Sequence, residues 1–238
     1  MWPEGAVLLK RFSFGEVLET RAMLRRGEAW QFATWLGDGS RAEGGELLTL
    51  TDGSGDFDYI VPRPKACEAC HQGGALGPRT AQLNGDASYD GVVRNQLAAL
   101  SELGVFAAAL PDDLPSLPPP DDADGVLADR ARSWLHGNCA HCHRPGGWTP
   151  PAMDMDLRWT TATEDTNTCG VDVESDLAPA AGDVRIVPGA ADESALWGRM
   201  TADDTTRMPP TGTRRLDPQA HELVRAWIDS MTGCPDGG

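Results

Sequence analysis

Hydrophobic and polar residues alternate along the first sixty residues, a pattern typical of short antiparallel strands. Strands are expected at 6–14, 17–24, 29–36, 46–50 and 57–61. Within the second segment the apolar side is formed by Leu18, Ala22 and Leu24. Glycine-rich turns separate these segments, so the sequence predicts an antiparallel sandwich or half-barrel.

The later part of the chain changes to a repeat near 3.6 residues, which predicts helices. One helix is expected from residue 127 to Gly137. Another begins with Asp217 as its N-cap and Pro218 in its first turn, and its apolar face reaches Met231. Shorter helices are expected at 91–103 and 193–200.

A stretch rich in proline and aspartate, PDDLPSLPPPDDADG at 111–125, lies between these two regions. Such a segment buries little surface and cannot be helical, so it is expected to be a stiff linker. The sequence therefore predicts an α+β fold: a β-rich domain at 1–110, a linker at 111–124 and an all-α domain at 125–238.

The chain is strongly acidic, with a formal net charge of −16 over 238 residues. This charge argues against binding to nucleic acid or anionic membranes and favours a partner with a basic face, unless it serves solubility alone. The N-terminal sequence MWPEGAVLLKRF lacks the features of a signal peptide. We therefore expect that a leader was removed or left out.

Two short motifs carry most of the chemistry in this sequence. CEACH at 67–71 and CAHCH at 139–143 both have the form C-x-x-C-H, the attachment signature of c-type haem. In such a motif the two thiols bond to one porphyrin edge and the histidine ligates the iron. The expected haem-binding residues are Cys67, Cys70, His71, Cys139, Cys142 and His143.

Zinc is the main alternative, because paired cysteines also build zinc sites, and a redox-active dithiol is a further one. Cys67 and Cys139 are 72 positions apart, and a histidine follows each pair; both features favour two haems over one shared zinc. Gly74 and Pro78 after the first motif match Gly146 and Pro150 after the second. A turn there is expected to offer a backbone carbonyl to the histidine Nδ1–H.

Met208, in the segment RMPP, is the expected sixth ligand of the second haem. Prolines behind it stiffen the chain, and a thioether opposite histidine raises the reduction potential. Met200 is expected in the core instead. His136, His141 and His221 are not expected to ligate iron, and the first and last of them are expected on the surface.

No sixth ligand stands out for the first haem. Met23, Met153 and Met155 are candidates, and without any of them the iron would be five-coordinate and open to small ligands. The remaining cysteines, Cys169 and Cys234, are expected to form a disulfide in an oxidising compartment, or else to be free buried thiols.

The ordered motifs VPRPKACEACH, LGPRTAQLN, RARSWLHGNCAHCHRPGG, RIVPG and RMPPTGT run through nearly the whole chain. Together they resemble a bacterial family of diheme c-type cytochromes, often encoded beside a parallel β-helix repeat protein. The C-terminal part also resembles the planctomycete-type cytochrome c module. This likeness implies haem-binding roles for Cys139, Cys142, His143 and Met208, and electron transfer in the periplasm or outside the cell.

The sequence therefore favours a diheme electron carrier with iron ligands His71, His143 and Met208 and two covalently attached haem c groups. Its expected partner is a redox protein with a basic face, and the resemblance adds a parallel β-helix repeat protein. The alternative is a haem enzyme, peroxidase-like or reducing another small oxidant, in which the first haem has an open coordination position.

Overall fold

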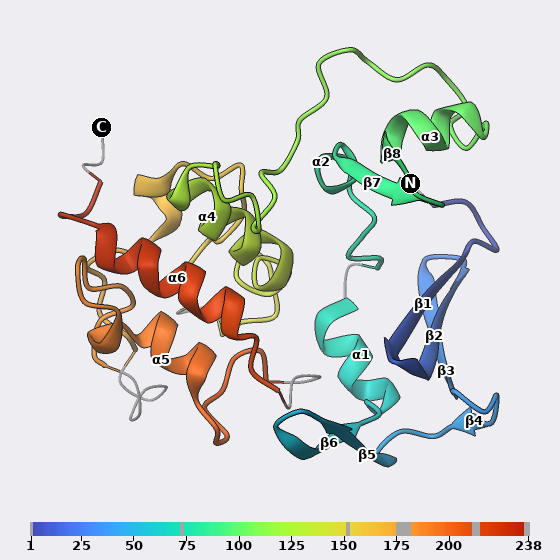
Figure 1. The fold of residues 1–238 in the computed structure, drawn as a ribbon, viewed down its shortest axis with the longest axis horizontal. Helices are drawn as coiled ribbons and strands as arrows, with labels where there is room; N and C mark the ends of the chain where they lie inside the picture. The colour runs from blue at the N-terminus through green and yellow to red at the C-terminus, as the bar shows by residue number, and fades with distance from the viewer. Residues whose placement is uncertain (1, 72–73, 151–152, 175–181, 211–214, 236–238) are drawn as a thin grey trace.

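The structure is a computed structural model that describes residues 2–71, 74–150, 153–174, 182–210 and 215–235. Antiparallel sheets fill the N-terminal half, and the longer helices α4 and α6 belong to the C-terminal half (Figure 1). The predicted β-rich N-terminal region is thereby confirmed. The mixed α and β content also agrees with the sequence.

The main sheet contains four strands in the order β1-β2-β3-β4, each antiparallel to its neighbour. Tight turns join the first three strands, and glycine takes a positive φ at Gly15 and Gly27, where a side chain would be strained. The strands are β1 (Val7–Phe14), β2 (Glu16–Arg26), β3 (Ala29–Leu36) and β4 (Arg41–Ala42).

Two further hairpins form sheets of their own, so the described strands form three separate antiparallel sheets. The expected sandwich or half-barrel stays a prediction. The first hairpin pairs β5 (Leu47–Asp52) with β6 (Gly55–Ile60), and the second pairs β7 (Asp86–Tyr89) with β8 (Val92–Asn95). The expected strands at 46–50 and 57–61 are confirmed within a few residues by the first of these.

The helix expected at 91–103 is only half correct. Asp90 and Gly91 both have positive φ, at 51° and 83°, which makes them the two-residue turn of the second hairpin. Asp-Gly is a strong signal for that turn, and it directs the next residues into β8. Helix α3 (Gln96–Glu102) starts only afterwards, where the Asn95 side chain accepts a hydrogen bond from the Ala98 amide.

The face of β2 that is turned toward the first motif differs from the predicted apolar side. It carries Glu19, Arg21 and Met23, and the side chain of Glu19 is fully buried. Both the Arg21 guanidinium and the Tyr59 hydroxyl of β6 donate hydrogen bonds to Glu19 Oε1. A buried carboxylate is tolerated only with such partners, and this network ties the main sheet to the first hairpin.

Helix α1 (Pro64–His71) follows β6 and ends on the first motif, and helix α2 (Thr80–Leu83) comes next. After α3, the chain runs through residues 103–126, all of them described, without a helix or strand. Part of this segment is bonded to the N-terminal half: Asn84 Nδ2 donates to the Leu114 carbonyl at 2.8 Å, and the Leu117 amide donates to the Ala81 carbonyl at 2.9 Å. The division into domains at 110 and 124 stays a prediction.

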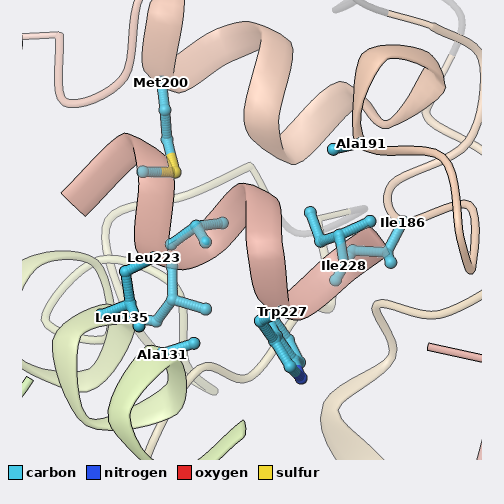
Figure 2. Packing of buried hydrophobic residues seen from close by; sticks show 9 residues of the cluster. Ala131, Leu135, Ile186, Ala191, Met200, Leu223, Trp227 and Ile228 are labelled. Atoms are coloured by element: carbon cyan, nitrogen blue, oxygen red, sulfur yellow. The ribbon is translucent and has the colours of Figure 1, made fainter. Parts of the chain in front are cut away.

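The core of the C-terminal half lies between helices α4 (Leu127–Asn138) and α6 (Pro218–Ser230), with α5 (Ala195–Thr201) against α6 (Figure 2). Ile186, Val224 and Ile228 are fully buried there. Burying each such side chain contributes about 1.5–3 kcal/mol. The N-cap at Asp217 is confirmed, because its carboxylate accepts hydrogen bonds from two amides of the first turn of α6.

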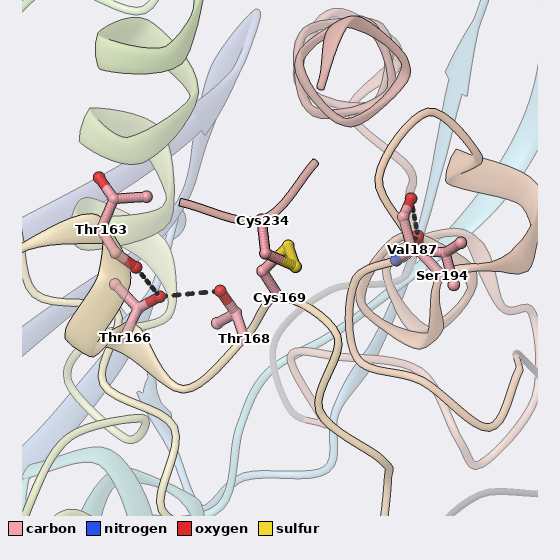
Figure 3. The surroundings of a disulfide bond; sticks show 7 residues. All are labelled: Thr163, Thr166, Thr168, Cys169, Val187, Ser194 and Cys234. Carbon is pink, nitrogen blue, oxygen red and sulfur yellow. Dashed lines mark hydrogen bonds between the residues drawn. A yellow bond between two sulfur atoms is a disulfide. The ribbon is translucent and has the colours of Figure 1, made fainter. Parts of the chain in front are cut away.

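Cys169 and Cys234 form a disulfide, with Cα atoms 5.5 Å apart and a sequence separation of 65 (Figure 3). The same region contains the short helices η1 (Thr163–Thr166) and η3 (Ala191–Glu193). Beside the disulfide, the Thr166 hydroxyl donates to the Thr163 carbonyl at 2.7 Å. Outside named strands, this part pairs its backbone through isolated bridges such as Cys169 with Ile186.

Candidate haem sites

The first motif occupies the end of helix α1, beside strand β3. The ring of His71 lies 5.6 Å from that of Phe32, and its Nδ1 lies 3.0 Å from the Gly74 carbonyl oxygen. That oxygen can only accept, so Nδ1 carries the proton and donates it. Nε2 is then the nitrogen left with a lone pair for a metal.

Gly74 holds this turn in a conformation that another residue would not adopt. Its φ is +101°, and a Cβ there would lie 2.6 Å from Trp30 Nε1. The turn expected after the first motif is therefore present. The matching position after the second motif is different: Gly146 also has positive φ, but nothing lies within 4 Å of its Cβ position.

A cavity of about 430 Å³ adjoins the first motif, between α1 and the main sheet. Its volume falls in the range of about 300–1,000 Å³ found for small-molecule and cofactor sites. Cys67, Cys70 and His71 line it together with Met23. Lys10 from the sheet adds positive charge to a mostly apolar wall, whereas the charge of Arg21 on the same wall is offset by Glu19. An apolar wall with a cation suits a flat apolar group that carries carboxylates.

The second motif follows directly on α4. The amides of Cys142 and His143 both donate to the Cys139 carbonyl, at 3.1 and 2.9 Å, so the motif forms one tight turn. Burial lowers the pKa of His143 to about 4, so its imidazole is neutral at pH 7. Its Nδ1 is buried and has no hydrogen-bond partner among the described residues. A neutral imidazole is the form that ligates metals.

His143 and Met208 line the same pocket, although 65 residues separate them in sequence. The backbone of Met208 is held by its own amide, which donates to the Arg199 carbonyl at 2.9 Å. The pocket is small, about 70 Å³, so its walls would have to separate to admit a porphyrin. The other sulfur-bearing residues on its wall are Cys139, Met153, Met155 and Met200.

The methionines considered as iron ligands are divided between the cavity at His71 and the pocket at His143. Met23 lies with His71, whereas Met153 and Met155, considered for the first haem, lie with His143. Met200 is buried in the core cluster, as expected, and also reaches the pocket wall.

Arg185 gives the pocket of His143 a buried positive charge. Its side chain is 5% exposed, and it donates to Asp154 Oδ1 at 2.8 Å and to the Asn167 carbonyl at 2.6 Å. Its Nε has no partner in the described part of the chain. A neutral histidine, thioether sulfurs and an arginine with a spare donor suit the iron and the propionates of a haem.

The two motifs meet each other, which sequence reasoning missed. The thiols of Cys70 and Cys142 and a ring nitrogen of His141 all lie within 4.8 Å of one another. Hydrogen bonds from Cys142 and then His141 lower the pKa of Cys70, and the bond to Cys70 raises the pKa of Cys142. Nothing in the sequence signals this contact, because 72 residues separate the cysteines.

His136 lies near the same junction and is partly buried, contrary to the expected surface position. Its Nδ1 accepts a hydrogen bond from the Trp159 amide at 3.1 Å, and its Nε2 lies 3.5 Å from the Arg79 guanidinium. Burial lowers the pKa of His136. His221 is likewise only partly exposed, and burial lowers its pKa.

One segment of the chain matches a known protein family. Residues 163–212 match the family of Planctomycete cytochrome C, a segment that contains Arg185 and Met208 and lies outside both C-x-x-C-H motifs. The match supports a cytochrome c-type module and implies covalently bound haem c, electron transfer and a location outside the cytoplasm. No curated protein and no solved structure shows significant similarity to the chain. Among the described residues, no helix has the length and apolar character to cross a membrane.

Proposed function

We propose that this protein is a diheme c-type cytochrome that transfers electrons in the periplasm or outside the cell. The observation that carries the proposal is the pocket in which His143 and Met208 meet, because that pair ligates iron in electron-carrying cytochromes. The second motif supplies the histidine, and the segment that matches a cytochrome family supplies the methionine.

In this proposal each motif holds its own haem. Cys67 and Cys70 would attach the first haem, and His71 would ligate its iron. Cys139 and Cys142 would attach the second, whose iron His143 and Met208 would ligate. A bound haem supplies one reversible electron at each site. The chain orients the ligand nitrogen of His71 through the Gly74 carbonyl, and keeps His143 neutral by burying it.

The acidic surface supports a redox partner with a basic docking face. With 36 acidic and 20 basic residues, the protein steers positively charged surfaces toward itself at low ionic strength. A parallel β-helix repeat protein is one partner that the family resemblance suggests. Association that weakens steeply with added salt would support electrostatic docking.

Haem content tests the proposal directly. The chain should be produced with a cytochrome c maturation system, and its intact mass should exceed that of the polypeptide by two haem groups. The double variant Cys67→Ser/Cys70→Ser and its counterpart Cys139→Ser/Cys142→Ser should each retain one haem. A colourless product that contains zinc instead would overturn the proposal.

The cavity at His71 favours a second candidate function, a haem enzyme acting on peroxide or another small oxidant. It is about 430 Å³, against about 70 Å³ at His143, so it leaves more room beside the bound group. Carbon monoxide added to the reduced protein distinguishes the two functions. Binding to half of the haem would favour the enzyme, and absence of binding would favour a pure electron carrier.

A further inference from the structure

The contact between the two motifs has a consequence for how the haems are arranged. Cys70 and Cys142 are the second cysteines of their motifs, and their sulfur atoms lie within 4.8 Å of each other. Each of these sulfurs would become a thioether on the edge of a porphyrin. Two porphyrin edges attached to these sulfurs would therefore lie next to each other.

We propose that the two haems are held edge to edge, in contact through the thioethers of Cys70 and Cys142 with His141 beside them. This inference rests on the proposed function, and it adds that the two haems form one relay and not two independent centres. Electron tunnelling falls off steeply with the distance between edges, so exchange between haems in contact would outpace exchange with a separate protein.

Neighbouring contacts keep the motifs together. Arg79, eight residues after His71, lies 3.5 Å from His136, three residues before Cys139. A Cβ at Gly137 would lie 3.7 Å from Gln82 Nε2, which is ordinary van der Waals contact. Residues on both sides of the junction thus pack against one another.

A second contact between the two halves lies away from the motifs. Arg215, just before α6, forms an ion pair with Asp52 of the β5–β6 hairpin and donates to the Ser54 hydroxyl at 3.3 Å. Its guanidinium also lies 4.9 Å from the Phe57 ring centroid. Contacts at two separate places restrict rotation of one half against the other.

Circular dichroism of the Soret band in the holoprotein tests the haem contact. Haems in contact couple their transitions, so the spectrum of the wild type should show a paired positive and negative band. The sum of the spectra of the two single-haem variants, Cys67→Ser/Cys70→Ser and Cys139→Ser/Cys142→Ser, should lack it. Electron paramagnetic resonance of the oxidised protein should likewise show signals broadened by the second haem. Either difference supports the contact.

Arg215→Glu and Arg225→Glu form a matched pair of variants for the same measurement. Both arginines pair with an aspartate and lie over an aromatic ring, but Arg225 bonds to Asp192 on the C-terminal half only. Arg215→Glu should lose most of the paired band, because it sets two negative charges against each other across the halves. Arg225→Glu should keep it.

The outcomes separate this inference from the proposed function. The protein could carry two attached haems and yet show a dichroism spectrum equal to the sum of the single-haem spectra, with resonance signals that also match their sum. That result would overturn the contact but leave the diheme assignment intact. A protein that lacks one of the haems would instead contradict the proposed function.

Discussion

Nδ1 of His71 donates to the carbonyl of Gly74 at 3.0 Å, whereas Nδ1 of His143 has no partner among the described residues. A hydrogen bond at Nδ1 makes an imidazole more electron-donating toward a metal on Nε2. That stabilises the oxidised iron. In the proposed diheme protein, the first haem should therefore have the lower potential, and the haem ligated by His143 and Met208 the higher one.

Gly74→Ala should raise the potential of the first haem. The new Cβ would meet Trp30 Nε1 at 2.6 Å, which moves the carbonyl away from His71. Gly146→Ala is the control, since it also places alanine at a positive φ but contacts nothing within 4 Å. Spectroelectrochemical titration should show two steps, of which only the lower shifts, and only in Gly74→Ala. Equal shifts in both variants would refute the role of the carbonyl.

Met208→Leu should lower the potential of one haem by at least about 60 mV, a tenfold change in its one-electron equilibrium. Loss of the thioether removes a ligand that favours reduced iron, and it opens that position to carbon monoxide. Met153→Leu is the matched control, because Met153 lines the same pocket. If Met153→Leu produces these changes and Met208→Leu does not, the ligand has been assigned to the wrong sulfur.

Glu19→Gln should destabilise the N-terminal half by about 3 kcal/mol, because it leaves Arg21 without a counter-charge in a mostly buried position. Arg21 is 26% exposed, so the lower end of the usual range for a broken buried pair applies. Urea unfolding at pH 7 measures the change. Glu16→Gln, at an exposed position on the same strand, should unfold like the wild type.

Asp156 should make stability depend on acid pH. Hydrogen bonds, chiefly from Arg158, lower the pKa of Asp156 from 3.8 to about 2. A carboxyl group whose pKa is lower in the folded than in the unfolded state stabilises the fold above pH 4, where it is ionised. For Asp156 this contribution is about 1–2 kcal/mol after allowance for the exposed Arg158. It is lost as the pH falls from 4 to 2.

Unfolding curves between pH 2 and pH 7 test this dependence. Asp156→Asn should be less stable than the wild type at pH 7 and equally stable near pH 2. The exposed Glu222→Gln should follow the wild type throughout. A gap between wild type and Asp156→Asn that is constant over the whole range would show that the ionised carboxylate of Asp156 does not contribute.

The sequence predicted the positions of strands and helices better than it predicted which side of each strand is buried. Strand alternation located β1, β2 and β3, and capping residues located α6, because both patterns are local. The side of β2 that faces α1 was misjudged because Glu19 is buried by partners distant in sequence, Tyr59 among them. The β7–β8 hairpin was missed although Asp90-Gly91 is a local signal for it.

For the candidate haem sites, too, the local features were predicted from the sequence and the long-range contacts were not. The residues of each motif were predicted from spacing alone, and Met208 from its prolines, and their haem-binding roles stay predictions. That Met153 and Met155 accompany His143, and that Cys70 adjoins Cys142, depends on how segments distant in sequence fold together. No local pattern encodes such contacts.

The Cys169–Cys234 bond places two opposing demands on maturation. These two thiols must be oxidised to close the C-terminal tail onto its loop. In the proposed diheme protein, the other four would have to stay reduced until they react with porphyrin vinyl groups. Cys70 and Cys142 lie near enough to be mispaired by the same oxidant. If the proposed function is right, the order of these covalent steps would therefore decide whether a newly made chain becomes a pigmented protein or a colourless, wrongly cross-linked one.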